Sequence, residues 1–183
     1  MTLAGRIRAL HQAFKEHDVP HAFGGAVALA YATEEPRGTR DIDVNVFLPA
    51  ERAADVLAML PPGIDQPAGT AETLARDGQI RLFWDDTPID LFLNYAPIHE
   101  EAGRHRRNVP FEGETIPVLG PVELAIFKAM FNRLRDWGDL EEMAKADMLD
   151  FDAVRDALAE MLGPDDERLT RLDDVARRAG DTA

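Results

Sequence analysis

Two aspartates lie two residues apart where an apolar strand pattern begins. Asp41 and Asp43 alternate with Ile42 and Val44, and residues i and i+2 of a strand project from the same face, about 7 Å apart at their Cα atoms. Two carboxylates held this close repel each other. A divalent cation removes the conflict, because Mg²⁺ prefers carboxylate oxygens together with a shared substrate phosphate. The pair therefore predicts a site for Mg²⁺ or Mn²⁺.

A third aspartate stands inside a second apolar strand pattern. In the segment PIDLFLN, Asp90 is the single acid among Ile89, Leu91 and Leu93. If this strand pairs beside residues 41–47, the three carboxylates converge on one face of a sheet. Metal ions held by such carboxylates can bind a nucleoside triphosphate and activate an attacking hydroxyl. The competing interpretation is that the acids are solvated caps at the ends of strands.

A pair of glycines precedes these acids and could serve phosphate groups. The segment FGGAVALA predicts a short strand, then Gly24 and Gly25, then a helix. Glycine permits close approach of the backbone, and the N-terminus of a helix favours anions. Two glycines before a helix are commonly just a tight turn. They become informative only because Asp-x-Asp and then a lone strand aspartate follow them along the chain.

The stretch FGGAVALAYATEEPRGTRDIDVNV resembles the signature of the nucleotidyltransferase superfamily with the polymerase-beta-like fold. Its form around Arg37, Thr39, Asp41 and Asp43 is most similar to the bacterial abortive-infection and toxin–antitoxin nucleotidyltransferases. Where the superfamily often has serine after a glycine, this chain has Gly25 and Ala26. The Gly-Gly form also occurs in the family, so the resemblance holds through this segment.

The second half of the chain carries a further part of the resemblance. Members of that group have a lysine on a helix and then Arg-Pro-Lys-Asp-x-x-Asp. This chain has Lys128 and then RLRDWGD over residues 133–139, in which Leu134 replaces the proline and Arg135 the lysine. The positive charge at position 135 is kept. The resemblance covers roughly residues 20–145.

The resemblance implies an enzyme of the EC 2.7.7 type that moves NMP from an NTP such as ATP to an acceptor hydroxyl and releases pyrophosphate. It implies that Asp41 and Asp43 bind Mg²⁺ or Mn²⁺, and that Asp90 is the third metal ligand or the base for the acceptor hydroxyl. The nucleotide-binding residues that it implies are Gly24, Gly25, Arg37, Thr39, Lys128 and Arg135.

Several of these basic and acidic residues also have an ordinary structural interpretation. Lys128 lies in the apolar segment IFKAMF, where a lysine usually extends to the surface. A helix that runs on from Pro121 would put Arg135 seven residues beyond Lys128 on the same face. The charged residues 133, 136 and 139 can be ion pairs on a helix surface, and their roles stay open.

The elements that must position these residues follow from apolar spacing and turn residues. Strands are expected in VPHAFGG, DIDVNVFL, GQIRLFW, TPIDLFLN and TIPVLGP, and helices over residues 3–17, in AVALAYA, in AERAADVLAML, and from Pro121 onward. Thr2 and Asp150 are candidate N-caps. This order predicts an α+β fold: a nucleotidyltransferase-type mixed β-sheet flanked by helices, with a C-terminal helical subdomain. We expect a catalytic core over residues 1–118 and the helical subdomain over residues 119–183.

Composition narrows the class of protein and its partners. The 183 residues are 45% hydrophobic and 30% charged, with no cysteine and a net charge of −14. No apolar run reaches the roughly 20 residues that cross a bilayer, and the N-terminus has no signal-peptide pattern, so we expect a cytoplasmic protein without membrane contact. A chain this acidic repels nucleic acid over most of its surface, so RNA binding would need a local basic patch. GRHRRN over residues 103–108 is a candidate patch or simply a solvated loop.

The sequence leaves the acceptor open. The toxin-like resemblance favours transfer to tRNA or to a protein, with a possible cognate antitoxin as partner. The alternative is an antibiotic-type enzyme that modifies a small hydroxylated molecule, which the acidic charge and small size favour. A non-catalytic nucleotide-binding or partner-binding module is the third possibility. A basic strip near the site would favour RNA, and its candidate members are Arg104, Arg106, Arg107, Arg133 and Arg135.

Overall fold

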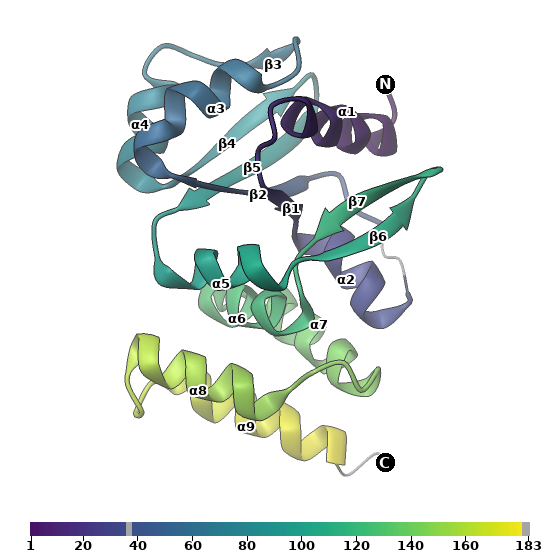
Figure 1. Cartoon of the computed structure of the whole chain (residues 1–183). Helices are drawn as coiled ribbons and strands as arrows, with labels where there is room; N and C mark the ends of the chain where they lie inside the picture. The colour runs from purple at the N-terminus through teal and green to yellow at the C-terminus, as the bar shows by residue number, and fades with distance from the viewer. Residues whose placement is uncertain (36–37, 181–183) are drawn as a thin grey trace. The chain divides into compact units, whose positions relative to one another are not determined.

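The computed structural model describes residues 1–35 and 38–180, and within these residues seven strands form one mixed sheet (Figure 1). The spatial order is β3-β4-β5-β2-β1-β7-β6. The strands are β1 (His21–Phe23), β2 (Ile42–Pro49), β3 (Ile64–Asp65), β4 (Gln79–Trp84), β5 (Thr87–Asn94), β6 (Arg107–Phe111) and β7 (Glu114–Val118). The pairs β2/β5 and β1/β7 are parallel, and the other neighbours are antiparallel. The predicted α+β fold with a mixed sheet and a helical C-terminal part is confirmed.

The helices are α1 (Leu3–Glu16), α2 (Gly25–Thr33), η1 (Ala50–Arg52), α3 (Ala53–Met59), α4 (Thr70–Asp77), α5 (Pro97–His105), α6 (Pro121–Phe131), α7 (Leu134–Lys145), α8 (Phe151–Leu162) and α9 (Glu167–Gly180). The chain divides into two compact units. The first is Met1–Val27 with Arg37–Leu119, which holds the whole sheet, and the second is Ala28–Pro36 with Gly120–Ala183, which holds α6 to α9. In the described part of the chain, no helix combines the length and the apolar character needed to cross a membrane.

The alternation of β2 and β5 separates an apolar face from a polar face. Ile42, Val44 and Val46 of β2 are completely buried, and so are Ile89, Leu91 and Leu93 of β5. The residues between them, which include the aspartates, point to the other face because successive side chains of a strand alternate. The apolar face is thereby committed to the core, and the register of the two strands is fixed by it.

Helix α1 lies against the apolar face, opposite the aspartates. Its residues Leu10 and Phe14 are completely buried, and the guanidinium of Arg6 donates a hydrogen bond of 2.8 Å to the Thr87 hydroxyl, on the apolar side of β5. The predicted cap is confirmed, since the Thr2 hydroxyl accepts from the Gly5 amide at 3.1 Å. Helix α1 therefore covers this face, so a functional site on β2 and β5 must lie on the opposite face of the sheet.

A buried pair of histidines joins α1 to β1. His21 Nδ1 lies 2.9 Å from the Val19 carbonyl oxygen, which accepts and so places the proton on Nδ1. His21 Nε2 is then an acceptor, and His11 Nδ1 donates to it at 2.9 Å. Burial lowers the pKa of His21 from 6.5 to about 4, and burial lowers the pKa of His11 as well. The fold thus holds both rings neutral.

Acid is expected to weaken the fold through this pair. Between pH 6.5 and pH 4, His21 is protonated in the unfolded chain but neutral in the folded chain. The free energy of unfolding therefore falls as the pH falls through this range. We expect a loss of about 3 kcal/mol from this residue, levelling off below pH 4. Urea unfolding at pH 7, 5.5 and 4.5 measures it. His21→Gln should flatten the pH dependence, whereas the exposed His17→Gln should not. An unchanged slope in His21→Gln would contradict this account.

Candidate functional site

Three aspartates lie on the polar face of the two central strands. Strands β2 and β5 pair side by side, the condition for the three acids to converge, with Asp43 directly opposite Asp90 in the parallel register. Asp41 precedes β2, two residues before Asp43, and so projects to the same side. On the other flank of Asp43, the Gly24 amide donates a hydrogen bond of 2.9 Å to the Asp43 carbonyl. We call Asp41, Asp43 and Asp90 the aspartate cluster.

Thr39 holds the first member of the aspartate cluster. Its hydroxyl donates a hydrogen bond of 2.5 Å to Asp41 Oδ1, and it accepts from the Asp41 amide at 3.4 Å. This is the local side-chain to backbone arrangement that threonine favours at the edge of an element. Thr39 therefore orients a carboxylate of the cluster, a role that the sequence did not specify. Arg37, the other member of the RGTRDID segment predicted to bind nucleotide, lies outside the described residues.

The two glycines meet the aspartate cluster through close packing at the start of α2. Gly25 has φ +49°, and a Cβ placed there would overlap the carboxylate of Asp43. A Cβ on Gly24 would lie 3.1 Å from Leu119 Cδ1 and 3.2 Å from Asn45 Nδ2. Only glycine combines a left-handed backbone with no side chain. Gly25 therefore requires glycine, whereas a side chain at Gly24 would need Leu119 and Asn45 to shift slightly, and the backbone of α2 begins directly against Asp43.

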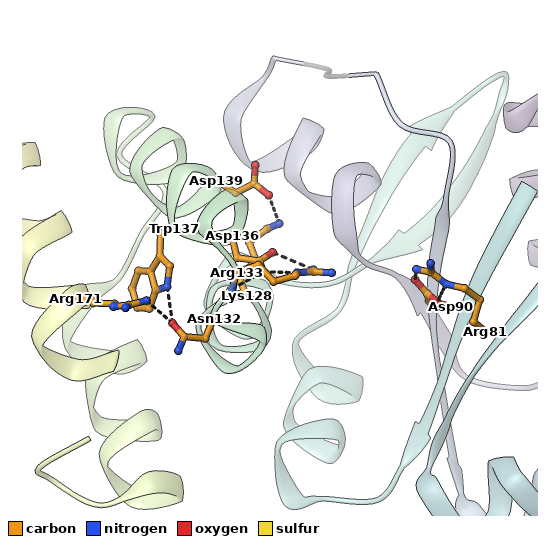
Figure 2. A network of polar contacts seen from close by, with 9 residues as sticks. All are labelled: Arg81, Asp90, Lys128, Asn132, Arg133, Asp136, Trp137, Asp139 and Arg171. Atoms are coloured by element: carbon orange, nitrogen blue, oxygen red, sulfur yellow. Dashed lines mark hydrogen bonds and ion pairs between the residues drawn. The ribbon is translucent and has the colours of Figure 1, made fainter. Parts of the chain in front are cut away.

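Asp90 is bound by an arginine that the sequence reading missed. Arg81 of β4 lies directly opposite Asp90, and its Nε and Nη2 donate to Oδ1 and Oδ2 at 2.7 and 2.6 Å (Figure 2). The hydrogen bonds to Asp90 raise the pKa of Arg81, and the charges of Asp90, Asp41 and Asp43 raise it further. Arg81 is thus electrostatically coupled to all three members of the aspartate cluster.

The residue types of the aspartate cluster suit a hard divalent cation. Carboxylate oxygens are the ligands that Mg²⁺ prefers, and the backbone register brings three of them to one face. As the side chains stand, however, no three His, Asp or Glu residues within 1–35 and 38–180 are grouped so as to hold a metal ion. Both oxygens of Asp90 accept from Arg81 in this arrangement.

The second unit contains Lys128, and there the lysine is buried. Its side chain is 6% exposed, and Nζ lies 2.5 Å from Oδ2 of Asp139, whose side chain is 10% exposed. The expected continuous helix is wrong: α6 ends at Phe131, and Asn132 adopts the left-handed conformation at φ +56°. The seven-residue spacing from Lys128 to Arg135 therefore does not place them on one helix face.

The remaining charged residues of RLRDWGD organise the start of α7. Asp136 accepts from the Arg133 amide at 3.2 Å, which caps the start of α7, and from the Arg133 guanidinium Nε at 2.6 Å. Asp136 is 1% exposed, whereas Arg135 is exposed. Asn132 Oδ1 accepts from Trp137 Nε1 at 2.8 Å, and Figure 2 shows these contacts gathered at the α6–α7 corner. Asp136 and Arg133 thus have a structural role in capping a helix.

The buried pair of Lys128 and Asp139 predicts a specific pattern of stabilities. Asp139→Asn leaves an ammonium buried without its counter-charge, and we expect a loss of about 3 kcal/mol in urea unfolding. Lys128→Met combined with Asp139→Leu should recover most of that loss, because no charge stays buried. Lys145→Met, which breaks the exposed Glu142 pair on α7, should cost less than about 1 kcal/mol. Equal, small losses for Asp139→Asn and Lys145→Met would show that water reaches Lys128.

The arginines of residues 103–108 are partly engaged inside their own segment. Arg104, near the end of α5, pairs with Glu100 and Glu101, and the Arg106 guanidinium donates to the Gly103 carbonyl. Their charges are therefore partly offset by nearby acids and a backbone oxygen. Gly103 also packs closely on Phe47, so that α5 covers the far end of the aspartate face.

Comparison with known proteins gives structural likeness without sequence matches. No family model matches the chain, and no curated protein matches it in sequence. The solution structure of the antibiotic-resistance factor ANT(2″)-Ia is similar with a TM-score of 0.54 at 14% identity, covering 98% of this chain and 93% of that one. ANT(2″)-Ia in complex with adenylyl-2″-tobramycin is similar with a TM-score of 0.54 at 15% identity, covering 97% and 98%.

A third similar structure has a comparable TM-score. It is an antigenic nucleotidyltransferase-like protein from Paracoccidioides brasiliensis, with a TM-score of 0.54 at 14% identity, covering 93% of this chain and 92% of that one. At these identities the likeness concerns the fold. Together with the sheet order and the helical C-terminal part, it shows that this chain has the fold of the nucleotidyltransferase superfamily.

Proposed function

We propose that the protein is a metal-dependent nucleotidyltransferase that moves NMP from an NTP to an acceptor hydroxyl. The observation that carries the proposal is the aspartate cluster, with Asp43 opposite Asp90 and with Gly25 packed on the Asp43 carboxylate. Three carboxylates on one face of a strand pair repel one another, and the single charge of Arg81 offsets only part of that repulsion. We propose that these acids bind a divalent cation, which in turn binds the phosphates of the NTP.

In this reaction the acceptor oxygen forms a bond to the α-phosphorus, and the bond from that phosphorus to the β-phosphate oxygen breaks. Pyrophosphate leaves, and the proton of the hydroxyl passes to a base, the role we propose for Asp90 unless it serves as a third metal ligand. A divalent cation, Mg²⁺ or Mn²⁺, neutralises charge on the phosphates when it is bound. Asp41 and Asp43 are the residues proposed to hold it, with Thr39 orienting Asp41.

The triphosphate is proposed to lie along the start of α2. Gly24 and Gly25 leave the backbone open there, and a helix N-terminus favours anions. Lys128, Arg135 and Arg37 remain proposed phosphate-binding residues. Lys128 would have to exchange Asp139 for a phosphate or act together with it, because its ammonium is paired. Lys128→Ala should weaken NTP binding if that exchange occurs.

We propose a small hydroxylated molecule as the acceptor, with a cationic antibiotic as the first class to test. The net charge of −14 attracts cations and repels nucleic acid. The fold likeness to ANT(2″)-Ia, seen with adenylyl-2″-tobramycin, covers almost the whole chain and supports the same class. The pairing of Arg104 with Glu100 and Glu101 weakens the basic strip that RNA would require.

A tRNA or protein acceptor is the second candidate, and a cognate antitoxin would accompany it. It is favoured by the R-x-T-x-D-I-D form around Thr39 and Asp41, together with the lysine and RLRDWGD pattern of the second unit. The exposed Arg135 would then be available for phosphate contacts.

One experiment tests the activity and separates these acceptors. The full chain is incubated with Mg²⁺ and each of the four NTPs labelled at the α-phosphate, with aminoglycosides, total tRNA or a protein extract as acceptor. We expect label in one acceptor class and an equal amount of pyrophosphate. Label in aminoglycoside supports the first candidate, and label in tRNA or protein the second. A folded protein that gives neither label nor pyrophosphate with any acceptor would contradict the proposal.

A further inference from the structure

The contact between Arg81 and Asp90 differs from an ordinary surface ion pair. Both oxygens of Asp90 accept from the guanidinium fork, at 2.7 and 2.6 Å, and the two residues are direct partners in the antiparallel β4/β5 register. The Asp90 side chain is 18% exposed and the Arg81 side chain 51% exposed. The carboxylate is therefore mostly shielded while half of the Arg81 side chain stays exposed, and Figure 2 shows the two groups facing each other.

A second pair on the same unit provides a comparison. Arg76 on α4 also donates through Nε and Nη2 to both oxygens of a carboxylate, that of Asp77, at 2.7 Å each. The charge of Asp77 raises the pKa of Arg76, whereas the charges of Asp90, Asp41 and Asp43 all raise the pKa of Arg81. The two forks use the same donor and acceptor atoms, but Arg81 also lies near enough to two further carboxylates to feel their charge.

From this arrangement we infer that Arg81 is the internal counter-ion of the aspartate cluster, and that a divalent cation competes with it for Asp90. The inference rests on the proposed function only in taking that cation to be the one used in nucleotidyl transfer. One positive charge reduces the mutual repulsion of three carboxylates while no metal is bound. The same charge opposes a second cation that arrives at the cluster.

The position of Arg81 allows this competition. About half of its side chain is exposed. The guanidinium can therefore leave Asp90 and stay hydrated in water. Asp90 then regains two free oxygens on the face that Asp43 shares. A divalent cation would then meet the carboxylates of Asp90 and Asp43 on one face.

Metal binding without nucleotide tests the inference independently of catalysis. Mn²⁺ is titrated into the full chain, and free Mn²⁺ is followed by electron paramagnetic resonance. Arg81→Met is expected to bind Mn²⁺ about fivefold more tightly than the wild type, the effect of removing one like charge at a part-exposed site. Arg81→Lys, which keeps the charge, should stay closer to the wild type, and Arg76→Met should equal it.

Thermal unfolding of the same variants provides a second readout. In EDTA, Arg81→Met should melt at a lower temperature than Arg76→Met, because the carboxylates lose their counter-charge, and Mn²⁺ should raise its melting temperature by more than that of the wild type. If Asp43→Asn abolishes Mn²⁺ binding but Arg81→Met binds no more tightly than the wild type, the inference is wrong and the proposed function stands. A wild type that binds no Mn²⁺ overturns both.

Discussion

Replacing Asp43 by asparagine is expected to slow NMP transfer by about 10³-fold, because the amide removes one negative ligand of the proposed cation. The fold should not suffer, since Asp43→Asn keeps the shape of the side chain and relieves repulsion from Asp90. We therefore expect the melting temperature to be level with that of the wild type or higher. Pyrophosphate release and thermal unfolding, measured on one preparation, check both halves of the expectation.

A matched control for this substitution lies in the same sheet. Asp65 of β3 is an exposed strand aspartate that takes no part in the aspartate cluster. Asp65→Asn should leave both pyrophosphate release and the melting temperature unchanged. A large fall in the melting temperature of Asp43→Asn would instead assign Asp43 a structural role, and retained activity would remove it from the site.

The second large effect is expected for Gly25→Ala. The added methyl group would overlap the carboxylate of Asp43, and alanine is strained at φ +49°. The carboxylate must move, and a misplacement of about 1 Å in a catalytic group costs about 10²-fold in rate. We also expect a loss of stability of about 2 kcal/mol. Steady-state pyrophosphate release and urea unfolding measure the two effects.

Gly113→Ala separates backbone strain from the overlap. Gly113 has φ +83° in the β6–β7 turn, and a Cβ there would meet nothing within 4 Å. It should cost about 1 kcal/mol of stability and leave the rate unchanged. If both variants lose stability equally and neither loses activity, the contact between Gly25 and Asp43 has no catalytic importance.

The strands that carry the site were predictable because their side chains alternate strictly. Period-2 alternation around Asp43 and Asp90 marks two half-polar strands, whereas the alternation does not display which strands become neighbours. Arg81, by contrast, could have been found from the sequence. A two-residue turn at Asp85 and Asp86 sets the register of β4 on β5, and that register puts Arg81 opposite Asp90.

Other elements carried weaker signals in the sequence. Strand β6 contains Pro110, which argues against a central strand, but β6 lies at the edge of the sheet, where proline is tolerated. Helix α4 is short and was not predicted, although Gly69 and Gly78 flank it as left-handed caps. Both were missed because pattern rules treat each segment without its neighbours in space.

The helix break before α7 and the conformation of Gly25 depend on contacts that a sequence does not display. Residues 131–136 are compatible with a continuous helix, and the break at Asn132 is held by Trp137 and by Arg171, which also donates to Asn132 Oδ1 at 2.8 Å. At Gly25 the Gly-Gly pair suggests a turn, but only the structure shows that the Asp43 carboxylate occupies the space that a Cβ of residue 25 would need. Long-range packing decides both features.

The measurement that tests the central claim most directly is mass spectrometry of small molecules, RNA and protein from cells that express the full chain and are supplied with an aminoglycoside. Wild-type expression is compared with Asp43→Asn at equal protein levels. The account predicts one class of molecule that carries an added NMP in cells with the wild type and lacks it in cells with Asp43→Asn. Finding no added NMP in any class, or the same amount in both cultures, would contradict it.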